Sequence, residues 1–329
     1  MHARKSILSL AILVALSGSA MADSSSVSTS QNGSRNVLNV DQRGATESSI
    51  NINQTGNNNT AGTGSAHGSP INQTATYSAL GINQNGAYNS AAANQAGNNN
   101  GAAINQTGTG VQRADLTQAG GFSNATIAQD YNSNTSASIN QGGGNNNTAN
   151  AAQSSNRGTS ATITQSGSYT SGTISQQDNT SAVARLRQAG NGNTGTVSQQ
   201  NNTLVSASLQ QSGNNNTGYV QQVNSGISSA SALQSGDYNS ANVYQNGSVL
   251  NADINQYGNN NYVSSTQTGS FNEESLLQSG NNNRAVVSQT GAGSLFAANT
   301  VGLTQAGNNL TANVSQTGGS GNVATIYQH

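Results

Sequence analysis

The sequence of 329 residues contains no cysteine, no tryptophan and a single proline, and only 4% of it is aromatic and 6% charged. Without cysteine no disulfide can stabilise the fold, and with so few aromatic side chains a large three-dimensional core cannot form. A formal net charge of −1 argues against nucleic acid or anionic lipid as a partner. The few scattered histidines and acids do not assemble a catalytic triad, a metal site or a cofactor site, so we expect no enzyme.

The first residues have the composition of an export signal. Two basic residues precede an apolar stretch over 7–16 that is too short to span a bilayer, and the triplet at 20–22 fits a cleavage site. We therefore predict a signal peptide over 1–22, with cleavage between Ala22 and Asp23. The exported chain would carry seven arginines against ten acidic residues, a net charge of −3.

Glutamine recurs along the rest of the chain at steps of 11 or 12 residues. There are 26 such positions from Gln31 to Gln328, and only two intervals differ, one of 19 residues and one of 16. A fixed period over this length indicates a stacked array of repeated units. The glutamines on which we base this ladder are Gln84, Gln95, Gln106, Gln118, Gln141, Gln165, Gln188, Gln211, Gln234, Gln256, Gln278 and Gln305.

The residues before each glutamine alternate with a period of two. The residue two positions before is Ile, Leu or Val at 21 of the 26 positions, and the residue four before is most often Ala. This alternation places Ala, the aliphatic residue and Gln on one face of a strand of about five residues, which a helix would not do. The core aliphatic residues predicted in this way include Ile104, Ile127, Ile163, Ile174, Leu209 and Ile254.

Glycine marks the end of most strands. It stands two residues after the glutamine at 19 of the 25 positions that have a successor. Glycine tolerates positive φ, so the pattern predicts a tight turn after each strand. The turn glycines are expected at Gly86, Gly97, Gly190, Gly213, Gly236, Gly258 and Gly280.

Glycine is replaced in every second unit between Gln129 and Gln222, so one full coil is about 23 residues, with two strands and two chemically distinct turns. With two of the 26 glutamines in each coil, the chain would form an all-β solenoid of about 13 coils. Each glutamine would then lie about 4.8 Å from its counterpart in the next coil. Amide donors and acceptors could satisfy one another along the axis, as in the Asn/Gln ladders of cross-β structures.

Within this array we expect a short leader over 23–30 and a repeat region over 31–329. Insertions near 61–70 and 291–298 interrupt the ladder, and we interpret them as surface excursions rather than docking loops. Glu274 stands where the pattern requires an inward Ala, so we expect that coil to be locally shifted or strained. Neither end shows a change of composition that would form a polar cap, which favours stacking of copies into filaments.

The repeats resemble those of the curlins, the subunits of bacterial curli fibres. Their pattern of Gln, Gly, Asn, Ala and Gln is matched by Gln84, Gly86, Asn89, Ala91 and Gln95. It is matched again by Gln278, Gly280, Asn283, Ala285 and Gln289, and partial versions cover most of the chain. The resemblance, closest to a long variant of the major subunit, implies a cross-β functional amyloid built from a β-solenoid subunit. It also implies a nucleator curlin, an outer-membrane secretion channel and a periplasmic chaperone as partners.

We therefore expect a structural subunit of an extracellular curli-like fibre, which assembles head-to-tail and supports biofilm matrix and surface adhesion. One alternative is a monomeric secreted solenoid that acts as an adhesin or an ice-binding protein. A flat outward face with regular rows of Thr or aromatic residues would favour that alternative, but the outward positions here are mixed. A second alternative is the minor nucleator of the same fibre.

Overall fold

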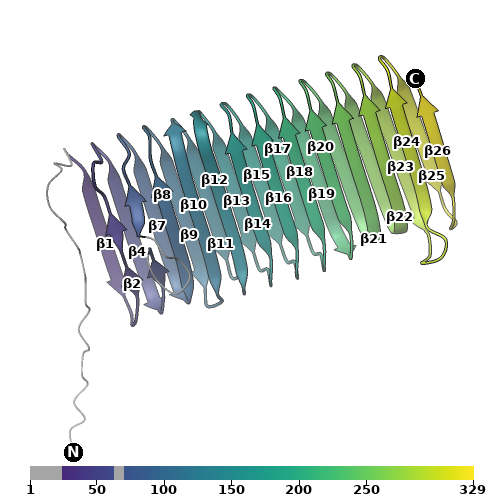
Figure 1. The fold of residues 1–329 in the computed structure, drawn as a ribbon. Coiled ribbons are helices and arrows are strands. Elements are labelled where there is room, and N and C mark those ends of the chain that lie inside the picture. The colour runs from purple at the N-terminus through teal and green to yellow at the C-terminus, as the bar shows by residue number, and fades with distance from the viewer. Residues whose placement is uncertain (1–23, 63–69) are drawn as a thin grey trace, which may run out of the picture.

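The computed structural model describes residues 24–62 and 70–329, and these residues contain no helix. The chain winds into a flattened solenoid of about 13 coils, in which consecutive coils stack along one axis from the first strand to the last (Figure 1). The all-β solenoid predicted from the sequence is therefore confirmed. The predicted signal peptide, its cleavage site at Ala22 and Asp23, and the part of the first insertion between 63 and 69 lie outside the described residues.

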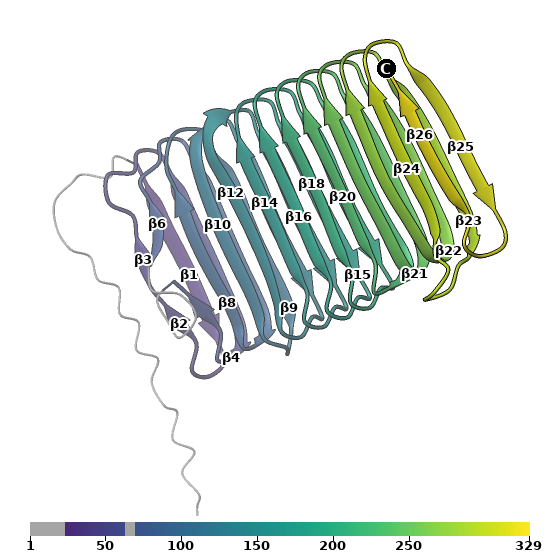
Figure 2. The same cartoon turned by 45° about the vertical axis from the view of Figure 1, so that its right-hand side comes forward.

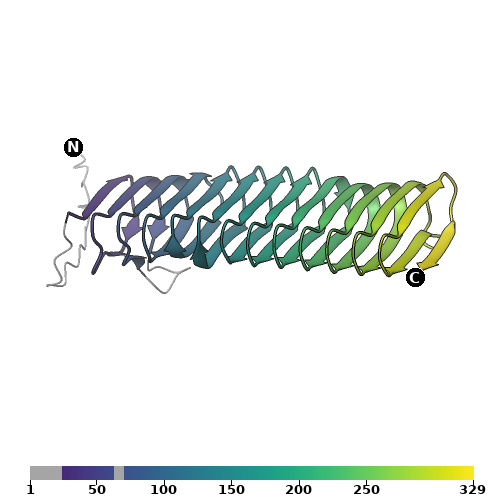
Figure 3. The same ribbon diagram turned by 90° about the horizontal axis from the view of Figure 1, so that it is seen from above.

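Two sheets form the two broad faces of the solenoid (Figures 2 and 3). Each strand is parallel to, and paired with, the corresponding strand one coil away, as in the pairing of β14 with β16 and of β15 with β17. The first sheet consists of β1 (Ser26–Asn32), β4 (Ser49–Asn57), β7 (Ala79–Ala87), β9 (Gly101–Gly108), β11 (Asn124–Asp130), β13 (Thr148–Ser154), β15 (Ser171–Gln177), β17 (Thr194–Gln200), β19 (Thr217–Gly226), the first halves of β21 (Ser240–Tyr257) and β22 (Tyr262–Ser279), β23 (Arg284–Ala292) and β25 (Thr311–Thr317).

The second sheet returns in each coil on the opposite face. It consists of β2 (Val37–Leu38), β3 (Val40–Asp41), β5 (Thr60–Ala61), β6 (Ile71–Gln73), β8 (Asn89–Gln95), β10 (Gln112–Gly121), β12 (Thr135–Asn145), β14 (Ser160–Ser166), β16 (Val183–Ala189), β18 (Ser206–Ser212), β20 (Ser229–Ser235), the second halves of β21 and β22, β24 (Asn299–Ala306) and β26 (Val323–Gln328). The strands β21 and β22 run without interruption from one sheet into the other, because their pairing continues around the corner.

The regular strands have seven residues rather than the expected five. In β15 and β17, for example, pairing begins at Ser171 with Thr194 and ends at Gln177 with Gln200. The extra residues at the two ends face outward and leave no hydrophobic signal in the sequence. They join the strand because backbone pairing with the next coil does not depend on the side chain.

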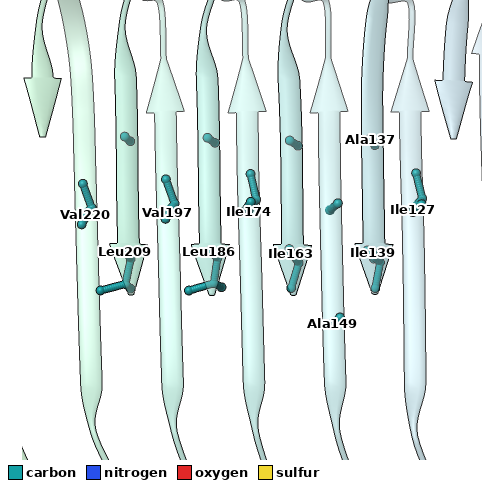
Figure 4. Packing of buried hydrophobic residues seen from close by; sticks show 14 of the residues in the cluster. Ile127, Ala137, Ile139, Ala149, Ile163, Ile174, Leu186, Val197, Leu209 and Val220 are labelled. Atoms are coloured by element: carbon teal, nitrogen blue, oxygen red, sulfur yellow. The ribbon is translucent and has the colours of Figure 1, made fainter. Parts of the chain in front are cut away.

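The interior between the sheets is a thin layer of aliphatic side chains (Figure 4). Ile127, Ile174 and Val197 of the first sheet and Ile163 and Leu186 of the second are all at most 1% exposed. This inward and outward alternation follows from the two-residue period of a strand.

Leucine and glycine compensate each other across this layer. A Cβ atom on Gly195 would lie 2.6 Å from Leu186 Cδ1, and one on Gly218 would lie 2.5 Å from Leu209 Cδ1. At these two positions glycine replaces the usual inward Ala, and the leucine of the opposite sheet occupies the space that the Ala side chain would need.

The second insertion lies outside the stack. Ser294 and Ala297 form an antiparallel bridge, and between them Leu295 and Phe296 are 73% and 96% exposed. The strands on the two sides of this loop keep their pairing register with the neighbouring coils, β24 with β22 and β23 with β25. The extra residues are accommodated without displacing the strands that they connect.

Of the local shift or strain expected at Glu274, the structure rules out the shift. Its Cα pairs in register with Ala252 in one neighbouring coil and Val301 in the other. The larger side chain fits because the inward residue opposite it in the same coil is Ser265, which is small and donates a hydrogen bond to the carboxyl group. Two departures from the pattern thus compensate each other.

Candidate functional site: amide ladders and open edges

The glutamines form two parallel ladders, one in each sheet. At every step the side-chain Nε2 donates to Oε1 of the glutamine in the following coil, at 2.6 to 3.1 Å. The direction never reverses. The side-chain amides of the whole solenoid therefore have one polarity, which runs from the N-terminal to the C-terminal coil.

The second amide hydrogen of most ladder glutamines reaches a backbone carbonyl inside the same solenoid. Gln188 Nε2 donates to Ser171 O and Gln211 Nε2 donates to Thr194 O, both at 2.9 Å. An interior glutamine thus uses both of its hydrogens and its oxygen. Leaving such a buried group unsatisfied would cost about 1–3 kcal/mol, and the repeat avoids this cost at each coil.

The structure divides the twelve predicted ladder glutamines between the two sheets. Gln84 and Gln106 lie in the first ladder, and the other ten lie in the second; all twelve are buried. The predicted core residues Ile104, Ile127 and Ile174 lie in the first sheet. Ile163, Leu209 and Ile254 lie in the second sheet, and these six are at most 1% exposed.

The seven predicted turn glycines adopt φ between +90° and +130°. Their main role is to allow the turns of adjacent coils to approach each other. A Cβ atom on Gly213 would lie 2.2 Å from Gly236 O, and one on Gly236 would lie 2.1 Å from Gly258 O. No side chain fits at these separations, so the stacking distance itself requires glycine.

A third ladder is formed by asparagines, which the sequence shows only as members of the repeat motif. Asn216 Nδ2 donates to Gly236 O at 2.7 Å, and its Oδ1 accepts the backbone N–H of Asn239 at 2.9 Å. Asn239 repeats both contacts with Gly258 O and with the N–H of Asn261. The signal in the sequence was the asparagine five residues after many ladder glutamines, and its regular recurrence distinguishes it from an ordinary turn residue.

The two end coils expose unpaired edges. In the part of the chain that the structure describes, β1 pairs only with β4, and β26 pairs only with β24. Outward residues donate their backbone N–H to the following coil, as Thr194 does to Asn216 O and Thr300 to Asn322 O, both at 2.8 Å. In a parallel pair, alternate residues of a strand bond to the strands on its two sides, so inward residues bond to the preceding coil and outward residues to the following coil. The N-terminal edge therefore has unpaired N–H and C=O groups on its inward residues, and the C-terminal edge has them on its outward residues.

The side chains of the end glutamines have the same complementarity. Among the described residues no donor reaches Oε1 of Gln31 or Gln42, whereas Gln316 and Gln328 each use only one amide hydrogen, to Thr300 O and Thr311 O. One end of each ladder therefore has a free acceptor and the other a free donor. A second copy stacked in the same orientation would extend all of these bonds.

Apart from Glu274, which is buried, the charged side chains of the described residues lie at the surface or are only partly buried. Arg43 pairs with Asp41, and its side-chain hydrogen bond holds the pKa of that carboxyl group below its ordinary value. Arg113 pairs with Asp115 at 2.9 Å. Within the described ranges no three His, Cys, Asp or Glu side chains are grouped so that they could hold a metal ion. No helix in the same ranges could cross a membrane.

Comparison with known proteins supports the resemblance found in the motifs. A family described as the Curlin associated repeat matches residues 258–291, which begin directly after β21, include β22 and end within β23. No curated protein matches the sequence. The repeat match confirms the predicted relation to the curlins, whereas the assignment to a long major-subunit variant stays a prediction.

Proposed function

Because the chain carries the curlin repeat and thereby belongs with the curlins, we propose that it is the structural subunit of an extracellular curli-like amyloid fibre. The fibre grows by head-to-tail addition of copies, the last coil of one molecule pairing with the first coil of the next. The observation that carries the proposal is the common polarity of the two glutamine ladders, which end in acceptors at one edge and in donors at the other.

The geometry of the edges supports growth without closure. A contact between two different, complementary surfaces generates an open filament unless a rotation closes it into a ring. The coil axis is nearly straight over the whole array (Figure 3), so successive copies continue along one line. Exposed strand edges of this kind are also the usual templates for pairing between chains.

The remaining parts of the proposal follow from the relation to the curlins. The fibre would contribute to biofilm matrix and to adhesion, and the chain would be exported after cleavage behind Ala22. A nucleator curlin, an outer-membrane secretion channel and a periplasmic chaperone would be its partners. The repeat and the solenoid fold are those of a structural protein rather than an enzyme.

A proline at Thr325 tests head-to-tail addition. Thr325 is an exposed, outward residue of β26, so its N–H points to the open edge rather than to β24. Proline removes this donor and places its ring in the path of an added strand, while the bonds inside the molecule remain. We expect the mature Thr325→Pro protein to keep its sheet signal in circular dichroism but to elongate wild-type seeds at least about tenfold more slowly.

Thr325→Ala is the matched control, and it should elongate at the wild-type rate because it keeps the N–H group. Growth is followed by dye fluorescence and electron microscopy. Equal elongation by the proline and alanine variants would exclude this edge as the site of addition. A wild-type protein that stays monomeric and sheet-rich for days would instead support the isolated solenoid.

A further inference from the structure

One coil of the solenoid contains a titratable group in its interior. Glu274, in the second half of β22, is 0% exposed, and Ser265, in the first half of the same strand, is also 0% exposed. The corresponding inward residues of the neighbouring coils are Ala252 and Val301 around Glu274. The pair therefore replaces two apolar side chains in an otherwise apolar layer.

The carboxyl group is only partly satisfied. Ser265 Oγ donates a hydrogen bond to Glu274 Oε2 across the interior. The other oxygen, Oε1, is buried and has no hydrogen-bond partner among the described residues. A neutral carboxyl group tolerates such a site far better than a carboxylate does, because a carboxylate has to replace its hydration.

Among the residues that the structure describes, no positively charged side chain is buried near Glu274 to offset ionisation of its carboxyl group. The inward residues of the strands packed against this site are uncharged: Ala252 and Ile254 in β21, Val287 and Gln289 in β23, and Val301 and Leu303 in β24. The titratable and charged groups of the same strands face outward, namely Asp253, Glu273, Arg284, Tyr244, Tyr257 and Tyr262. Burial accordingly raises the pKa of Glu274 to about 7, although the hydrogen bond from Ser265 opposes this shift.

We propose that the protonation state of the Ser265–Glu274 pair controls the stability of the coil formed by β22. The coil is stably folded while the carboxyl group is neutral, and it opens more readily when the carboxyl group ionises. We call this pair the proton-controlled joint. In a stacked array each coil is stabilised by its neighbours, so one weakened coil separates the coils before it from those after it. The joint would thus uncouple the C-terminal end of the solenoid, including the edge formed by β25 and β26, from the coils that precede it.

The direction of the pH dependence follows from the two protonation states. In the unfolded chain the carboxyl group ionises near its ordinary value of 4.5, whereas in the folded coil it stays neutral up to about 7. The contribution of the neutral Glu274 side chain to the stability of this coil is therefore fully present below pH 4.5 and is lost as the pH rises through about 7. This inference concerns one molecule and does not depend on whether copies polymerise.

Amide hydrogen exchange of the full mature chain at pH 5 and pH 8 tests the joint, with protection corrected for the intrinsic rate at each pH. Freshly prepared monomer is used. We expect protection over 262–279 to fall about a hundredfold at the higher pH relative to protection over 148–235. Glu274→Gln, which keeps the shape without the charge, should abolish this difference, and so should Glu274→Ala, which restores the residue of the repeat.

Glu273→Gln is the matched control, since it removes an exposed carboxyl group from the same strand. It should leave the pH dependence of protection unchanged. Equal protection at both pH values in the wild type would overturn the proposal. A pH-dependent loss that persists in Glu274→Gln, or one that disappears in Glu273→Gln, would overturn it as well.

Discussion

The central coils and the end coils of this solenoid contain the same kinds of side chain in different surroundings. Val197 in β17 is 0% exposed, whereas Ile326, which occupies the equivalent position of its own repeat in β26, is only half-buried. The inward residue Val27 of β1 is 45% exposed. A coil therefore does not bury its own interior, and burial is supplied by the coils on either side of it.

This difference is the reason why we propose the two ends as the sites at which copies add to one another. Each central strand has its backbone groups paired on both sides, and each end strand has one unpaired side. Addition of a copy would give an end coil the surroundings that a central coil already has. The same substitution should therefore have different effects in the two regions, and three pairs of variants measure that difference.

The largest difference is expected for proline. Thr196 in β17 is an outward residue, two positions after Thr194, so its N–H donates to the next coil by the same alternation. Thr196→Pro removes this bond and places a ring between paired strands, and we expect a loss of about 5 kcal/mol in the free energy of unfolding. Chemical denaturation measures this loss in a Thr325→Pro background, in which we expect assembly to be slow, with Thr325→Pro alone as the reference.

Thr325→Pro by itself should lower the free energy of unfolding by less than about 1 kcal/mol, because its N–H has no partner within the molecule. If both prolines destabilised the protein equally, β26 would not be an open edge. If neither did, the alternation of backbone donors assigned to the central strands would be wrong.

The next difference concerns the row of turn glycines. A Cβ atom on Gly213 would lie 2.2 Å from Gly236 O, whereas one on Gly307, the last glycine of the same row, has nothing closer than 3.4 Å. Gly213→Ala should therefore cost about 4 kcal/mol, from the clash together with the unfavourable φ, and Gly307→Ala about 1–2 kcal/mol from φ alone. Denaturation of the two variants checks the order. Equal losses would show that backbone conformation, and not the approach of coils, requires glycine.

The repeat made the solenoid predictable from the sequence. The position and contacts of a single residue were predictable only where that residue follows the common pattern of the repeat. The period of the glutamines gave the coil and its two strands, since inward positions keep their residue type in most coils. The predicted coil with two glutamines already implies two rows, although the motif alone does not tell the two rows apart, because both strands of a coil carry it. The sequence did not show that the asparagines are buried, because asparagine is common in any turn.

Residues that break the unit were less predictable, because their partners are distant in sequence or lie in other coils. Ile227 and Val249 have φ of +49° and +56°, a conformation that β-branched residues rarely adopt. Ile227 is held there by its N–H bond to Thr203 O in the preceding coil, at 3.0 Å. Glu274 was predicted to disturb its coil because its compensation by Ser265, nine residues earlier, becomes visible only when the two sheets face each other.

The smallest of the three differences is expected for the glutamines themselves. Gln199 accepts from Gln176 at 2.7 Å and donates to Gln222 at 2.9 Å and to Val183 O at 3.1 Å. Gln199→Leu leaves a donor of Gln176 and the acceptor of Gln222 buried without partners, so we expect a loss of about 3 kcal/mol despite the gain in apolar burial.

Gln328→Leu, at the half-buried end of the other ladder, removes only the acceptor used by Gln305 and a bond to Thr311 O. Water can replace these contacts at the open edge, so its cost should stay below about 1 kcal/mol. Its effect should appear instead in elongation, which measures whether the free donor of Gln328 is used by the next copy. Equal losses of unfolding free energy in the two leucine variants would mean that a ladder glutamine contributes as much in an end coil as in a central coil. The energetic difference between central and end coils would then be absent.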